Sequence, residues 1–222
     1  MNNEVVQFIL SLSIGPAVII GIIKFKTIDK SYYPFFYLAT ISLLVEIISY
    51  ILIEKELFTV KLVMINIFCL IEFFFYTWLF HLWGLFNFKQ RYFIYIMASA
   101  VVIWLVFSFY PAGFTSPNMY FRVIYGTTLL FFAVTAFNKL VIQDRAYLVK
   151  NPKFWILLGV IIFFSFYLLS RTASLSLFGI DTSKQLRRGL QEVIGYSNLI
   201  VNLMFAIGAL CIPRKKNFTT LF

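Results

Sequence analysis

The stretch LVMINIFCLIEFFFYTWLFHLWGL (residues 62–85) decides the fold class of this chain, because it is almost wholly apolar and long enough to cross a lipid bilayer. A transmembrane helix needs about 20 mostly apolar residues to span roughly 30 Å of hydrocarbon. Six further runs of this kind occur in the 222 residues, of which 61% are hydrophobic and 13% charged. We therefore predict an all-α polytopic membrane protein, a bundle of seven transmembrane helices.

The connections between the apolar runs are short, which leaves no room for a separate soluble domain and predicts one transmembrane domain over residues 1–222. Helix-start signals support two of the boundaries. Pro34 and Pro152 suit the first turn of a helix, and Asn151 is a candidate N-cap. The predicted spans cover residues 5–23, 34–53, 62–85, 92–109, 119–140, 153–170 and 191–212.

The distribution of Lys and Arg predicts the orientation, because cytoplasmic loops of membrane proteins carry an excess of positive charge. With the N-terminus outside and the C-terminus inside, twelve of the 19 Lys and Arg residues lie in the inner loops and tail, against seven outside. The last outer loop departs from this rule, since it carries Arg171, Lys184, Arg187 and Arg188. We expect a multi-pass protein of the inner (cytoplasmic) cell membrane. The formal charge of +10 belongs to this pattern and does not indicate nucleic-acid binding.

Polar residues inside the predicted spans are the candidate site residues, since an ionisable group in hydrocarbon costs several kcal/mol. Glu46 and Glu72 are expected to face the bundle interior. There they are either neutralised by an Arg or a hydroxyl or line a functional cavity, and both readings stay open. We also expect Arg122 or Arg171 within salt-bridge reach of a carboxylate such as Glu192 or Glu46. The candidate residues for a ligand site or polar core are Glu46, Asn66, Glu72, Tyr76, Arg122, Tyr125, Arg171, Glu192, Asn198 and Asn202.

Three segments carry a resemblance to known proteins. NPKFWILLGVIIFFSFYLL (151–169), taken with NLIVNLMFAIGALC (198–211), resembles a group of small, uncharacterised bacterial seven-span membrane proteins with an NPxFW opening of the sixth helix and an Asn-containing last helix ending in Cys. NIFCLIEFFFY (66–76) is similar to their third helix. The resemblance supports the seven-span topology, draws attention to Asn66, Glu72, Tyr76 and Asn151, and implies no particular activity.

Several functional classes are excluded by missing residues. A retinal protein needs a Lys in its last helix, and the predicted span 191–212 has none. A zinc-dependent seven-span hydrolase needs several His and Asp ligands, whereas this chain has one His and places its three Asp in loops. It also lacks a Gly-x-Ser-x-Gly motif and a glycine-rich phosphate loop. The two cysteines, Cys69 and Cys211, lie within apolar runs. We therefore predict no cofactor, no metal site and no disulfide, and an enzyme is disfavoured.

Three functions remain open. The favoured one is a receptor-like or interaction subunit that binds a ligand or partner at an outer or intramembrane polar pocket and signals to a cytoplasmic protein. The alternatives are a conduit for protons, ions or small solutes, and a lipid-modifying enzyme that uses Glu46 and Glu72 as acid and base. The expected partners are the lipid bilayer, a possible cytoplasmic protein and a possible second copy of the chain, with no nucleic acid.

Overall fold

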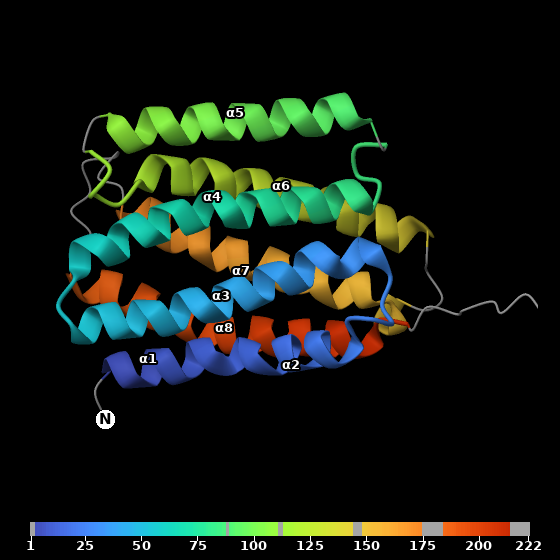
Figure 1. The fold of residues 1–222 in the computed structure, drawn as a ribbon, viewed down its shortest axis with the longest axis horizontal. Coiled ribbons are helices and arrows are strands. Elements are labelled where there is room, and N and C mark those ends of the chain that lie inside the picture. Colours follow the sequence, from blue (N-terminus) through green and yellow to red (C-terminus); the bar gives the residue numbers. More distant parts are fainter. Residues whose placement is uncertain (1–2, 88, 111–112, 144–147, 175–183, 214–222) are drawn as a thin grey trace, which may run out of the picture.

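A computed structural model describes residues 3–87, 89–110, 113–143, 148–174 and 184–213. Long helices with short connections make up this part of the chain (Figure 1). Their bounds are α1 Asn3–Ser11, α2 Gly15–Lys24, α3 Tyr33–Glu54, α4 Phe58–Leu82, α5 Gln90–Phe109, α6 Met119–Gln143, α7 Pro152–Ser174 and α8 Lys184–Cys211. The all-helical polytopic membrane fold expected from the hydropathy is therefore what the chain adopts.

Within the described residues, six helical segments are long and apolar enough to cross a membrane. They lie at Lys30–Glu54, Phe58–Leu82, Gln90–Phe109, Met119–Gln143, Pro152–Ala173 and Glu192–Cys211. A seventh apolar helical segment, Phe8–Lys24, is shorter. Large apolar side chains such as Ile22, Ile23 and Phe131 are more than half exposed on the outside of the bundle, as expected for a protein surrounded by lipid.

The first apolar run differs from the single helix expected over residues 5–23. It is interrupted by one 3-10 turn, η1 (Leu12–Ile14), between α1 and α2. Pro16 stands in the first turn of α2 and has no N–H to continue the α-helical pattern back to Leu12. The hydroxyls of Ser11 and Ser13 donate to the Phe8 and Leu10 carbonyls, a side-chain bond that bends helices.

The helix starts follow their predicted signals. Asn151 caps α7, since its side-chain oxygen accepts from the Lys153 backbone N–H at 3.0 Å, and Pro34 lies in the first turn of α3. The helix α8 begins at Lys184, whereas the predicted span begins at residue 191.

The first and last helices lie side by side and run in the same direction (Figure 1). At one end, the Lys24 ammonium donates to the α8 carbonyl of Leu210 at 2.6 Å and reaches that of Ala209 at 3.3 Å. The last carbonyls of a helix have no N–H donor within the helix, so a nearby cation stabilises them. Nearer the middle, the Asn202 amide donates to Ser13 Oγ at 2.8 Å. The N-terminal segment is thus fixed to α8 at two levels.

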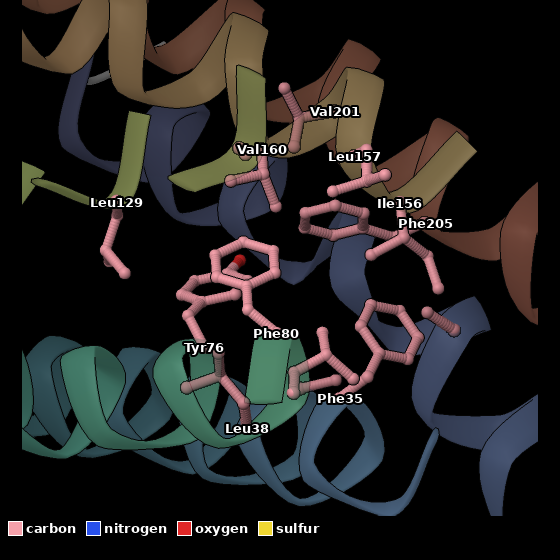
Figure 2. Packing of buried hydrophobic residues seen from close by; sticks show 14 of the residues in the cluster. Phe35, Leu38, Tyr76, Phe80, Leu129, Ile156, Leu157, Val160, Val201 and Phe205 are labelled. Carbon is pink, nitrogen blue, oxygen red and sulfur yellow. The ribbon is translucent and has the colours of Figure 1, made fainter. Parts of the chain in front are cut away.

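The core lies between α4, α7, α8 and α3, while α5 lies at the edge of the bundle, against α4 and α6 (Figure 1). Figure 2 shows the rings of Tyr76 and Phe80 on α4 directed toward Val160 and its neighbours on α7. Phe35 meets Phe205 of α8 edge to face, with ring centroids 5.4 Å apart. These residues form a tightly packed layer across the bundle.

Candidate functional site

A cavity of about 470 Å³, here called the main cavity, lies among α1, α3, α4, α6, α7 and α8. Its positively charged lining residues come from the ends of three helices: Lys61 from the start of α4, Arg122 from the start of α6 and Arg171 from the end of α7. These helix ends lie at the same end of the bundle as the N-terminus (Figure 1). Glu46 and Glu72, from the middle of α3 and α4, also line it.

A smaller cavity of about 110 Å³, the deep cavity, adjoins the main one toward the middle of the bundle. Ser11, Glu46, Phe68, Glu72, Phe163 and Asn198 line both cavities. The deep cavity also reaches Tyr76 and Asn202, and it ends against Val201 and Phe205. Both carboxylates therefore face the bundle interior, as predicted.

The buried side chain of Asn66 connects α4 to the 113–118 loop and to α6. Its Oδ1 accepts from Arg122 at 3.1 Å and from the Asn118 backbone N–H at 3.2 Å. Its Nδ2 donates to the carbonyls of Ser116 at 2.8 Å and Phe114 at 3.3 Å. The single Asn side chain thereby holds the loop and orients the Arg122 guanidinium beside the cavity.

Asn118 extends the same network to α5 and caps α6. Its Oδ1 accepts from the Phe121 backbone N–H at 3.1 Å, which satisfies a free N–H at the start of α6. Its Nδ2 donates to Ser108 Oγ of α5 at 3.0 Å. Trp104 of α5 donates to the Asn66 carbonyl at 2.9 Å. The end of the bundle around Arg122 is therefore fixed by neutral hydrogen bonds from three helices.

Glu72 lies deeper on α4 and is only 8% exposed. Its Oε2 accepts from the Tyr125 hydroxyl of α6 at 3.1 Å. Cys69 lies one turn earlier on α4 and is reached by the charges of Arg122, Glu72 and Arg171. Arg122, Glu72 and Arg171 thus all lie around Cys69, on one wall of the main cavity.

Both guanidinium groups keep hydrogen-bonding capacity. Nε of Arg122 and Nε of Arg171 are buried and have no hydrogen-bond partner among the described residues. Arg171 lies over the Tyr167 ring, 5.0 Å from its centroid, and Arg122 is 5% exposed. An unpaired N–H of a buried cation is costly, and a carboxylate or phosphate that accepts from it removes that cost.

The salt bridge expected for these arginines is not formed. Arg122 donates to the neutral Asn66, and within the described part of the chain neither Arg122 nor Arg171 forms an ion pair with Glu46 or Glu192. The Glu46 carboxyl instead faces Ser11 and the charge of Lys61 across the main cavity. Arg122 is held by the Asn66 amide and Glu72 by the Tyr125 hydroxyl, so each has a neutral partner in place of an opposite charge.

Most of the predicted site residues are brought together. Glu46, Glu72, Arg122, Tyr125, Arg171 and Asn198 line the main cavity, Tyr76 and Asn202 line the deep one, and Asn66 lies directly behind Arg122. Glu192 is exposed and is not among the lining residues. The side chains of Arg187 and Arg188 lie outside the described residues.

Three residues of the site region were not predicted from the sequence. They are Lys61, Asn118 and Trp104. Each lies near a helix end, where polar and aromatic residues are common, so the sequence pattern did not single them out.

The described residues contain no group of three or more His, Cys, Asp and Glu placed to hold a metal ion. His81 stacks on Phe93, with ring centroids 4.8 Å apart, and lies outside both cavities.

Comparison of the chain with protein-family models, with curated proteins and with solved structures gives no match. The function is therefore inferred from the main cavity and its lining residues.

Proposed function

We propose that this chain is a receptor-like membrane protein that binds a small anionic ligand in the main cavity. One observation carries the proposal: two arginines whose Nε groups have no hydrogen-bond partner in the described part of the chain border a cavity of about 470 Å³. Ligand pockets for small molecules are commonly 300 to 1,000 Å³, in order of magnitude. Arg suits the recognition of carboxylate and phosphate, because its forked donors match their oxygens.

The proposed topology has seven spans, with the broken first segment as the first of them. The excess of Lys and Arg in the alternate loops supports an N-terminus outside and a C-terminus in the cytoplasm. In the inner membrane of a cell, the main cavity then opens toward the outside. The NPKFW opening of α7 and the Asn-containing α8 ending in Cys211 support kinship with the small bacterial seven-span proteins.

The proposed signal passes along α8. Its Asn198 lines both cavities, its Asn202 is bonded to Ser13, and its last carbonyls bind Lys24 at the opposite end of the bundle. A ligand that shifts α8 therefore also shifts the N-terminal segment at the cytoplasmic end. That end is where a cytoplasmic protein, or a second copy of the chain, would read the change.

The shape of the cavities supports binding over conduction or catalysis. Beyond the deep cavity, Leu79, Phe80 and Ile156 are fully buried. Figure 2 shows Phe80 and Ile156 within the packed apolar layer. A conduit needs polar groups that continue to the other end. Acid and base catalysis by Glu46 and Glu72 would place the reaction in the same cavity, and it gives no role to the Nε groups of Arg122 and Arg171, which have no hydrogen-bond partner among the described residues.

The test is anion binding to the purified protein in detergent at constant ionic strength, with acetate and inorganic phosphate as probes. We expect either anion to raise the thermal midpoint saturably. Arg171→Gln should weaken this effect about tenfold to a hundredfold, the cost of losing a hydrogen bond to a charged group. We choose Arg171 because Arg122 also holds the fold through Asn66.

The matched control is Arg91→Gln, which removes an exposed arginine of α5. It should bind the probes as the parent protein does. An equal loss in Arg91→Gln and Arg171→Gln, or no saturable shift in the parent protein, would show that the main cavity is not an anion site.

A further inference from the structure

The main cavity is lined by both basic and acidic side chains, and this feature goes beyond an anion site. Lys61, Arg122 and Arg171 line it together with Glu46 and Glu72. Opposite charges in a low-dielectric interior attract strongly and normally pair when their side chains are free to meet. Within the described residues the arginines and these carboxylates form no ion pair, so something keeps them apart.

Neutral groups hold three of these side chains in place. Asn66 Oδ1 accepts from Arg122 at 3.1 Å, and the Tyr125 hydroxyl donates to Glu72 at 3.1 Å. Arg171 rests on the Tyr167 ring. Each of these partners satisfies part of a charged group without cancelling its charge. A ligand group of the opposite charge can therefore still be bound at each position.

The two kinds of charge also lie at different depths. Arg122 is held at the level of Asn66, and Glu72 lies six residues further along α4, which corresponds to about 9 Å at 1.5 Å per residue. The three cationic residues come from the helix ends at the N-terminal end of the bundle, whereas both carboxylates also line the deep cavity. The cavity thus has a cationic outer pole and an anionic inner pole.

We propose that the ligand is a zwitterion, with an acid group and an ammonium group separated by a short chain. This proposal rests on the proposed anion site. The acid group, a carboxylate or a phosphate, binds Arg122 and Arg171. The ammonium group binds Glu72 or Glu46 at the inner pole. Free amino acids with a terminal amine and the ethanolamine phosphate headgroup of a phospholipid both have this chemistry.

The experiment compares matched pairs of probes that differ only in the amino group. Propionate is paired with β-alanine, and ethyl phosphate with phosphoethanolamine, each titrated against the thermal midpoint of the protein in detergent at constant ionic strength. We expect the member that carries the amine to bind about tenfold to a hundredfold more tightly, the effect of one added charge-assisted hydrogen bond. A preferred phosphate pair indicates the lipid headgroup, and a preferred carboxylate pair the free amino acid.

Two variants locate the ammonium group. Glu72→Gln and Glu46→Gln keep the shape of the side chain and remove its charge, so one of them should bring the two members of a pair to equal affinity while propionate binding persists. Equal binding of propionate and β-alanine by the parent protein, with ethyl phosphate and phosphoethanolamine also equal, would overturn the zwitterion proposal. A preference for the amine that survives in both variants would overturn it as well. If no member of either pair raises the midpoint, the anion site itself fails.

Discussion

Replacement of Asn66 by leucine is expected to lower the free energy of unfolding by about 3 kcal/mol, because a buried hydrogen-bonding group left unsatisfied costs about 1–3 kcal/mol, and more when it is charged. The variant removes the acceptor for Arg122 and for the Asn118 N–H, and the donors to Ser116 and Phe114. Hydrogen bonds between membrane helices average less than about 1 kcal/mol each, so the buried guanidinium dominates the loss. Steric trapping in bicelles measures the difference.

Two further variants make the Asn66 result specific. Asn66→Asp keeps an oxygen that accepts from Arg122 and should retain most of the stability that leucine loses. Asn138→Ala removes an exposed Asn from α6 and should change the free energy of unfolding by less than about 0.5 kcal/mol. A leucine variant as stable as Asn138→Ala would mean that Asn66 does not hold Arg122 in the folded protein.

Phe80→Ala is expected to cost about 2–3 kcal/mol. Phe80 is fully buried and packs against Tyr76, Trp83 and Phe132. In a soluble core the same change costs about 3–5 kcal/mol, part of which is transfer from water. Lipid is as apolar as the core, so in a membrane only the packing lost around the new cavity remains.

Phe131 on α6 supplies the control for Phe80, because it is 67% exposed on the outside of the bundle. Phe131→Ala should leave the free energy of unfolding within about 0.5 kcal/mol of the parent value. Equal losses in the two variants would contradict the packed layer beneath the cavities and, with it, the argument that the cavities end inside the bundle.

The fold class was predictable because apolar length is a strong signal: an unbroken apolar run such as residues 62–85 has few soluble alternatives. The break at Leu12–Ile14 was not predicted, since Pro16 and the serines that cause it are tolerated in membrane helices and do not interrupt the hydropathy. The observed helix ends also differ from the predicted span ends, for a similar reason. Thus α4 begins at Phe58, four residues before the predicted span, because polar residues such as Lys61 extend a helix beyond its apolar part.

The site was predictable as a set of residues but not as a geometry. Periodicity places Glu46 and Glu72 on inward faces, and the cost of buried charge selects them. Which groups meet depends on the rotation of each helix and on the path of the 113–118 loop, which hydropathy does not specify. Arg122 was therefore expected beside a carboxylate but binds Asn66. Glu192, two residues before the cavity-lining Ile194, remains exposed.

The central claim is that a cation-lined cavity opens at the N-terminal end of the bundle. Its most direct test is thiol labelling of Ser49→Cys, in a protein whose Cys69 and Cys211 are replaced by alanine. Ser49 lines the main cavity, whereas Thr77, fully buried on α4, lines neither cavity. An impermeant anionic methanethiosulfonate, added on the side of the N-terminus, should label Ser49→Cys about tenfold faster than a cationic one, because the cationic lining concentrates anions. Labelling of Ser49→Cys that is as slow as that of Thr77→Cys, or faster with the cationic reagent, would contradict the claim.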